Sequence, residues 1–507
     1  MTLEAERDPE LLLKSAQGRG VLTATILGSG MAAIDGTVVN VALPRIGEDL
    51  NAGLTALQWT VNAYTLTLSG LLLLGGSLGD RMGRRRIYIV GVLWFTAASI
   101  GCALAPLAGV LVAMRALQGI GAALLTPGSL AILEAVFRKD DRAAAVGAWS
   151  GLGGVATAVG PVLGGVLVGV APWGWRLVFL INVPIAVAVI WFADRFIPET
   201  RDEEAGGDLD VLGVVLAALG LGLVVYALTE GPQRHWPGWL IGCLVAGIGV
   251  LVLFVISQAH ARSPVMPLGL FRSRQFAAVN AVTLVVYAAL SGAFFLIPVV
   301  LQRVAGFTPV AAGSALLPVT AVMLLLSSRM GRLATRIGPR VPMTVGPLVA
   351  AVGLVLLVRI GPHASYLADV LPGVLVFALG LSATVAPLTA TALASAPVHQ
   401  VGVASAINND VARTAGLLSV AVLPGLAGIT PAAYDHVDQL ASGFHNAVLI
   451  AAGLCALGGL LSAVFIEGGA ERPAREERAE DPAALQPHCP VLAPHARPGH
   501  CPSPAQR

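Results

Sequence analysis

Charged residues are scarce in this 507-residue chain. Asp, Glu, Lys and Arg make up 12% of it, whereas about 25% is usual in a soluble domain. Lysine occurs only as Lys14 and Lys139, and neither completes the Gly-Lys-Ser/Thr end of a phosphate-binding loop, so we expect no ATP-driven pump. The net charge of +2 is too small to indicate a nucleic-acid partner.

Cysteine is also rare, and its placement argues against a disulfide framework. Three of the five cysteines fall in apolar segments and two in a polar tail, so we expect five free thiols. In that tail, the spacing of His488, Cys489, His495, His500 and Cys501 matches no standard zinc site, so we predict no metal and no cofactor. No cluster of a nucleophile and a base is apparent among the polar residues of the apolar segments, and we therefore predict that the chain is not an enzyme.

Apolar residues, by contrast, make up 56% of the chain, together with 59 glycines, which are frequent where membrane helices pack closely. About 20 apolar residues span a bilayer as a helix. The sequence therefore predicts an all-α integral membrane protein with fourteen transmembrane helices. They are expected near 21–43, 57–79, 87–105, 109–133, 144–170, 177–195, 211–229, 238–257, 276–299, 310–329, 341–359, 370–393, 405–428 and 446–466.

The basic residues orient these helices. With a cytoplasmic N-terminus, about nineteen Lys and Arg fall in the inside loops before the tail and about five in the outside loops, as the positive-inside rule requires. An even number of spans also places the C-terminus inside. Arginine outnumbers lysine 29 to 2, as in GC-rich genomes. We therefore expect a multi-pass plasma-membrane protein with both termini cytoplasmic, in a bacterial inner membrane.

An internal repeat divides the chain. The segment from Gly76 to Arg85 recurs 255 residues later, from Gly331 to Arg340. The repeat indicates two equivalent six-helix bundles with two inserted helices, and such parallel repeats carry a substrate site between the halves at the bilayer midplane. The expected segments are 1–20 (N-terminal), 21–197 (first bundle), 198–210 (linker), 211–257 (inserted helices), 258–275 (linker), 276–466 (second bundle) and 467–507 (disordered tail).

Asp35 lies well inside the first expected helix, roughly 12 Å from its outer end. An ionised Asp at a helix centre costs about 2.5 to 3.5 kcal/mol, so this carboxyl must be protonated, be paired or face a wet cavity. A change in its burial or in a nearby charge would then load or release a proton. The alternative is a carboxyl group that only hydrogen-bonds a neighbouring helix. Asn40 follows in the same run as a supporting polar residue.

Arg115 lies at a similar depth in the fourth expected helix, with Gln118 on the same face. An arginine cannot lose its proton, so it needs a partner or water, and Asp35 is the carboxylate available at that level. The pair is interpreted as an arginine-controlled proton site. A static salt bridge between helices remains the alternative.

Three further groups are candidates. The loop with Gly76, Asp80, Arg81, Gly83 and Arg84 is either a charged gate or a turn with a topology signal. The fifth helix carries a smooth face of small residues with Gly160, Pro161, Gly164 and Gly165. This face either lets the helix move against its neighbours during transport or only allows close packing. Asn409, Asp410 and Arg413 line a cavity or, as we favour, form a structural pair within the thirteenth helix.

Together these motifs resemble those of the major facilitator superfamily, in particular its fourteen-helix drug:proton antiporter branch, over residues 20–466. The similarity rests on the runs 35–44, 76–85, 115–119, 160–165 and 175–184. It implies proton coupling at Asp35 and Arg115, a loop at Asp80 that governs alternating access, and export of small amphipathic drugs or antibiotics from the bilayer-embedded chain, driven by the proton-motive force. A dedicated exporter of one endogenous natural product and, less favoured, a proton symporter for uptake stay open, as does the oligomeric state.

Overall fold

The computed structural model describes residues 11–201, 210–261, 264–397 and 400–468, and within these ranges the regular secondary structure is helical apart from one isolated β-bridge. The first half of the expected N-terminal segment, most of the first linker and nearly all of the tail, with its histidines and cysteines, therefore lie outside the described residues. The helices are α1 (Ala16–Asp49), α2 (Leu54–Met82), α3 (Arg84–Ala103), α4 (Ala108–Val136), α5 (Lys139–Gly169), α6 (Trp175–Leu180), α7 (Asn182–Phe196), α8 (Val211–Glu230), α9 (Gly238–His260), α10 (Arg274–Arg303), α11 (Pro309–Ser314), α12 (Leu317–Ile337), α13 (Arg340–Leu356), α14 (Leu371–Ala394), α15 (Val401–Leu426), α16 (Pro431–Tyr434) and α17 (Val437–Phe465).

The all-helical membrane fold is confirmed, but the count of fourteen spans is not reached. Within the described residues, twelve helical segments are long and apolar enough to cross a membrane, or thirteen if the bent helix Leu54–Met82 counts as one span. The segment missing from this set is α15, since polar and charged side chains occupy its first half. Helix α15 is nevertheless long enough to cross a membrane, because its 26 residues exceed the roughly 20 that a bilayer requires.

Two of the expected spans are broken helices. The sixth divides into α6 and α7 at Ile181, and the tenth divides into α11 and α12. Proline explains both breaks: Pro184 and Pro318 carry no N–H, so neither can bond the carbonyl four residues earlier. Most of the other helices run several residues beyond their predicted bounds, because a helix continues into the polar interface where hydropathy no longer marks it.

Close helix pairs build each half of the molecule. In the first half, α2 and α3 pack on α4, and α1 packs on α5 and α7; in the second, α13 packs on α14 and α17, and α10 on α15 and α17. Glycine permits the closest approaches. A Cβ added to Gly121 would lie 2.5 Å from the Phe95 nitrogen, and one added to Gly380 would lie 2.3 Å from the Ala350 nitrogen.

The repeated segment adopts the same backbone turn in both copies. Gly83, between α2 and α3, has φ +104°, and Gly338, between α12 and α13, has φ +84°. Both angles lie in the left-handed region, which side chains with a Cβ avoid. The two glycines are 255 residues apart, so the sequence repeat corresponds to a repeated local structure.

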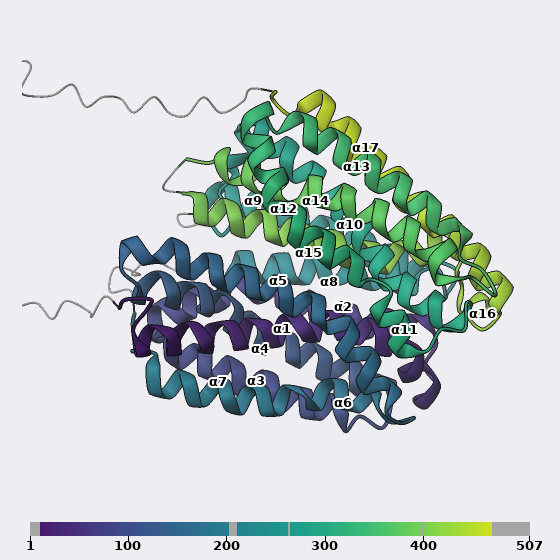
Figure 1. Cartoon of the computed structure of the whole chain (residues 1–507), viewed down its shortest axis with the longest axis horizontal. Coiled ribbons are helices and arrows are strands. Elements are labelled where there is room, and N and C mark those ends of the chain that lie inside the picture. The colour runs from purple at the N-terminus through teal and green to yellow at the C-terminus, as the bar shows by residue number, and fades with distance from the viewer. Residues whose placement is uncertain (1–10, 202–209, 262–263, 398–399, 469–507) are drawn as a thin grey trace, which may run out of the picture.

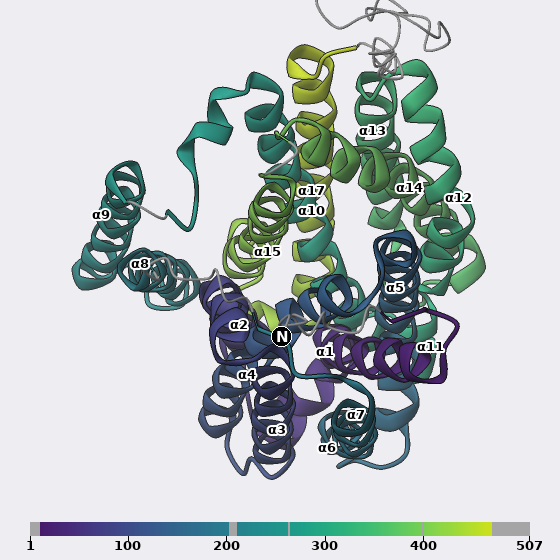
Figure 2. The same cartoon turned by 90° about the vertical axis from the view of Figure 1, so that its left-hand side faces the viewer.

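Helices α8 and α9 lie at the side of the molecule (Figure 2). Helix α8 packs against α2 and α15, whereas the main neighbour of α9 is α8. Little of α9 is buried, and its exposed side chains include Trp239, Ile241, Val245, Ile248 and Val252. This apolar surface suits contact with lipid acyl chains.

The two halves touch near one end of the molecule, as Figure 1 shows on its right. We call this the α16 end; the opposite end, with Gly83, Gly338 and both described chain ends, is the Gly83 end. Among the described residues, the side-chain hydrogen bonds between the halves run from Gln302 to the Val41 carbonyl, from Gln58 to the carbonyls of Val420 and Ala421, and from Asn62 to the Leu417 carbonyl. All lie in the portions of their helices nearer the α16 end.

Candidate functional site

An ion pair lies inside the first half of the molecule, remote from solvent. Arg115 Nη1 on α4 donates to Asp35 Oδ2 on α1, and the two side chains are 1% and 0% exposed. Removing either partner would leave a buried, uncompensated charge, which costs several kcal/mol. The structure thus brings together the two residues that their depths in the sequence had suggested as partners.

Neutral polar groups complete the hydrogen bonding of the Asp35 carboxylate. Gln118 Nε2 donates to Asp35 Oδ1 at 2.8 Å, and Asn182 Nδ2 donates to the same oxygen at 3.1 Å. Gln118 also accepts a 2.7 Å bond from Arg115 Nη1, and the Ser99 hydroxyl accepts from both amides, at 3.2 and 2.9 Å. The result is a buried network whose members come from α1, α3, α4 and α7, in which the Asn182 Oδ1 atom has no hydrogen-bond partner within the described structure.

Sequence reasoning did not assign Ser99 and Asn182 to this network. Asn182 carried a signal, because it lies in the 175–184 run and at the broken end of a membrane helix, where a polar side chain is expensive unless it bonds a partner. Ser99 carried none, since a serine in a membrane helix commonly bonds its own backbone.

Two aromatic rings enclose the Arg115 guanidinium. Its central carbon lies 4.2 Å from the Tyr64 ring centroid and 5.8 Å from that of Phe179. Its Nε donates to the Thr60 carbonyl at 3.0 Å. Cation–π contacts of this kind are worth about 2 kcal/mol when desolvated, so the rings both stabilise the cation and exclude water from the ion pair.

Tyr64 also faces a cavity between the halves. Two adjoining cavities, of about 430 and 330 Å³, share Gly36, Thr65 and Arg413 in their walls, and together we call them the central cavity. The walls come from α1, α2, α4, α5, α10 and α15. Tyr64 lines the larger part, so this residue contacts both the buried ion pair and the cavity.

The remaining polar candidates lie on or near this cavity. Asn40 lines its smaller part, and Asn40 Oδ1 has no hydrogen-bond partner in the described structure, so it stands apart from the Asp35 network. Asn409 and Arg413 also line the cavity. No salt bridge joins Asp410 to Arg413 within the described ranges, and Asp410 Oδ1 is buried without a hydrogen bond. The two side chains therefore form no direct salt bridge, although they are close enough for their charges to interact.

The small-residue face of α5 contacts both halves. A Cβ on Gly160 would lie 2.0 Å from Thr37 Oγ1, and one on Gly164 would lie 2.8 Å from the Val38 carbonyl oxygen, both on α1. On α11, a Cβ on Gly313 would lie 2.1 Å from the Pro161 carbonyl oxygen. In turn, a Cβ on Gly165 would lie 2.5 Å from the Pro309 carbonyl oxygen. Helix α5 therefore joins the halves near the α16 end through backbone-close contacts.

The charged loop is organised within the first half. Asp80 near the end of α2 pairs at 2.8 Å with Arg84, the first residue of α3, across the Gly83 turn. The Glu199 carboxylate accepts from the backbone nitrogens of Arg85 and Arg86, at 3.1 and 3.2 Å, and so caps the N-terminus of α3. Gly76 packs against Pro127 of α4, and Arg81 occupies the last turn of α2.

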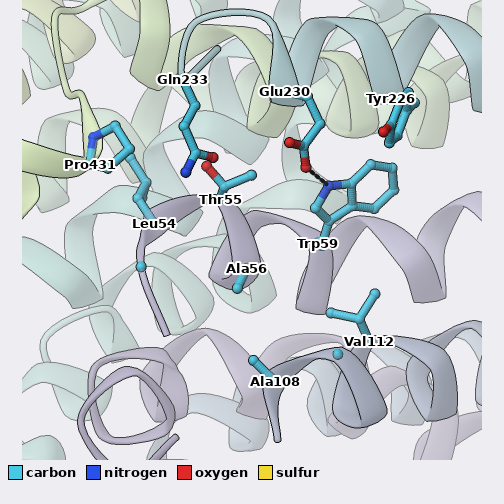
Figure 3. A pocket seen from close by; sticks show the side chains of 12 residues that line it. Leu54, Thr55, Ala56, Trp59, Ala108, Val112, Tyr226, Glu230, Gln233 and Pro431 are labelled. Carbon is cyan, nitrogen blue, oxygen red and sulfur yellow. Dashed lines mark hydrogen bonds between the residues drawn. The ribbon is translucent and has the colours of Figure 1, made fainter. Parts of the chain in front are cut away.

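A separate cavity of about 560 Å³ lies at the α16 end, where α2, α4 and α8 meet (Figure 3). Trp59 Nε1 donates to Glu230 there at 3.1 Å, as Figure 3 shows, and Glu230 also pairs with Arg234 at 2.9 Å. These contacts attach α8 to α2. Within the described residues, no group of three or more His, Cys, Asp or Glu side chains is placed to hold a metal ion.

Comparison with known proteins places this geometry in context. Residues 25–421 match the family model described as Major Facilitator Superfamily. The chain is 35% identical over 405 residues to the multidrug resistance protein Stp of Mycobacterium tuberculosis, covering 79% of this chain and 74% of that one. It is 34% identical over 454 residues to the puromycin resistance protein pur8 of Streptomyces alboniger, covering 87% and 90%.

Solved structures share the fold at low sequence identity. The crystal structure of a D-xylose-proton symporter superposes with a TM-score of 0.62 at 16% identity, covering 89% of this chain and 97% of the symporter. A likeness at this level concerns the arrangement of the helices.

Proposed function

The chain belongs to the major facilitator superfamily, and from this premise we propose that it is a proton-coupled antiporter that exports amphipathic drugs or antibiotics across the cytoplasmic membrane by alternating access. Its relatives support export, since Stp is named for multidrug resistance and pur8 for puromycin resistance. The buried Asp35 beside the central cavity is the single observation that carries the coupling.

The proposed cycle uses the Asp35 carboxyl as the proton carrier. In the described state it is enclosed by Arg115, Gln118 and Asn182, an arrangement that holds a carboxylate. Proton loading would remove the charge that Arg115 pairs with and would weaken this network. If the switch between inward-facing and outward-facing states alters this network, it changes the affinity of Asp35 for a proton. Proton coupling requires such a change.

The proposal includes a topology. We assign α15 as a further span, which completes fourteen with α2 counted as one, and we place six spans on either side of the inserted pair α8 and α9. The Gly83 end is assigned to the cytoplasm, with both termini, because its loops hold most of the basic residues. The contacts at the α16 end would then close the outer side, so that the described state faces inward.

Two other functions share the fold. A dedicated exporter of one endogenous natural product would have the same coupling and differ only in the breadth of its substrates. An uptake symporter is the more distant alternative, and the superposition on a D-xylose-proton symporter shows that the helix arrangement alone does not exclude it.

Everted membrane vesicles with an acidic interior separate these functions. The test uses a panel of anionic, neutral and cationic dyes and antibiotics added outside, at the face that was cytoplasmic. An antiporter accumulates a substrate inside as protons leave, whereas a symporter depletes the interior of it. We expect accumulation with the wild type and none with Asp35→Asn. Depletion, or accumulation that the loss of Asp35 leaves unchanged, would reject the proposal.

A further inference from the structure

The described residues that line the central cavity carry charge of one sign only. Among the residues that line it, Arg413 carries the one charged side chain in the described structure, and none is an Asp or Glu. The remaining polar lining consists of hydroxyl and amide groups. A ligand that enters the cavity therefore meets one positive charge and no negative one.

Among the described residues the Arg413 guanidinium has no direct bonding partner, although the Asp410 carboxyl, one turn earlier on α15, lies within electrostatic range of it. Within the described ranges it makes no salt bridge, and no hydrogen bond to it is found, although it is only partly exposed and reaches the walls of both parts of the cavity. By contrast, Arg115 bonds Asp35, Gln118 and the Thr60 carbonyl. The five N–H groups of a guanidinium form a fork that matches carboxylate and carbonyl oxygens.

Aromatic rings accompany this charge. Tyr64 and Trp149 line the larger part of the cavity, and Tyr287 and Phe294 line the smaller part. Trp149 is held in place by a 2.9 Å bond from its Nε1 to the hydroxyl of Ser29, which also lines the cavity. Rings and a single cation suit a planar apolar body that bears oxygen acceptors.

We infer that the central cavity selects planar aromatic compounds that carry an oxygen acceptor, and that it prefers an anionic acceptor (carboxylate or phenolate) to a neutral carbonyl. Arg413 is the residue that binds the acceptor and excludes cations. The inference rests on the proposed export function and narrows its substrate class. A cationic compound would bring a second positive charge into a cavity whose walls provide no carboxylate to pair with it.

Equilibrium binding to the full chain in lipid nanodiscs tests this without any proton gradient. Three probes of one shape differ in charge: anthraquinone-2-carboxylate, anthraquinone-2-carboxamide and 2-(aminomethyl)anthraquinone. The proteins are the wild type, Arg413→Gln, Arg413→Lys and a control, Arg359→Gln, whose side chain is 61% exposed and outside the cavity. Empty nanodiscs give the partition blank, and equilibrium dialysis gives the dissociation constants.

The wild type and Arg359→Gln should bind the carboxylate most tightly, the carboxamide next and the ammonium compound least. Arg413→Gln should weaken the carboxylate about tenfold, the expected loss of a charge-assisted hydrogen bond, and leave the carboxamide within about threefold. Arg413→Lys should keep the same order of probe affinities, with a smaller preference for the carboxylate. This variant keeps the prediction testable if Arg413→Gln fails to fold.

Three results would overturn the inference: tighter binding of the ammonium compound by the wild type, equal weakening of all three probes by Arg413→Gln, or no binding of any probe above the blank. The same titration with Asp35→Asn separates the two proposals. If Asp35→Asn keeps the same order of probe affinities and still exchanges protons normally, proton coupling at Asp35 is rejected and the inferred substrate class is retained.

Discussion

The Tyr64 ring lies 4.2 Å from the Arg115 guanidinium carbon and forms part of the central cavity wall. It is therefore a group that both the buried ion pair and a compound in the cavity can contact. Both Arg115 and Arg413 lie within electrostatic range of it. A compound that displaces this ring would change the surroundings of Asp35 without touching the carboxylate.

Replacement of Tyr64 separates the effect of the ring from that of the hydroxyl. Tyr64→Phe keeps the ring over Arg115 and loses only a long 3.4 Å bond to the Ala32 carbonyl, so we expect exchange within about twofold of the wild type. Tyr64→Ala should open the ion pair to cavity water and lower drug-driven proton exchange about tenfold. Equal losses in both variants, measured in proteoliposomes, would show that the ring has no such role.

Loss of Asn182 should slow exchange, because Asp35 Oδ1 would lose one of its two neutral donors. A buried hydrogen bond to a charged group contributes about 1.5 to 3 kcal/mol, so Asn182→Ala should reduce the rate at least about tenfold. The control is Asn446→Ala, whose side chain bonds the Ala427 carbonyl away from the network. An Asn182→Ala rate equal to that of the control would count against the network.

The glycine face of α5 offers a matched pair. A Cβ at Gly160 would overlap the Thr37 hydroxyl at 2.0 Å, whereas a Cβ at Gly151 on the same helix meets nothing within 4 Å. We expect Gly160→Ala to destabilise the protein by about 1 to 3 kcal/mol through overpacking, and Gly151→Ala to leave it unchanged or slightly more stable. Thermal unfolding in detergent would reveal the difference. The same midpoint for both variants would mean that α1 and α5 tolerate the added methyl group.

The contacts at the α16 end should set which way the cavity opens. Gln58 donates to the Val420 carbonyl at 2.6 Å across the halves, and its loss should cost the closed state about 1 kcal/mol. Gln58→Ala should therefore increase the population open at the α16 end about fivefold, measured as spin-label distances between α2 and α15. Gln400→Ala, at the Gly83 end, should not change it. An unchanged distance distribution for Gln58→Ala would contradict this role.

The charge of the substrate sets the electrical character of transport. Exchange of one inward proton for one outward anion moves two elementary charges, each worth about 2.3 kcal/mol per 100 mV, whereas exchange for a neutral compound moves one. If the cavity selects acidic aromatic compounds, a potassium diffusion potential should accelerate carboxylate export more steeply than carboxamide export. Equal responses of the two would indicate that the carboxylate crosses in its neutral, protonated form.

Depth along a helix is what made the central pair predictable. A rise of 1.5 Å per residue places Asp35 and Arg115 at one level of the membrane, and the cost of isolated charge there makes them partners. The turns at Gly83 and Gly338 followed from the repeat in the same way. Each of these predictions depends on a local property, the depth of a residue within its own helix or the backbone angle of a turn, and not on how the helices pack.

The rest depended on packing that a single sequence does not encode locally. Ser99 and Asn182 join the network because α3 and α7 happen to face α1 at that depth. The expected bond between Asp410 and Arg413 followed from i+3 spacing, yet Arg413 lies on the cavity wall. Helical spacing shows which side chains share a face, whereas the neighbouring half decides what that face contacts.

Proton movement driven by the drug alone tests the coupling most directly. Proteoliposomes are loaded with a transported compound from the vesicle panel and an internal pH indicator, with no imposed pH gradient, and then diluted. As the compound leaves, the wild type and Glu48→Gln, an exposed change on the same helix, should acidify the interior, and Asp35→Asn should not. Equal acidification per exported molecule by Asp35→Asn would contradict the assignment of Asp35 as the proton carrier.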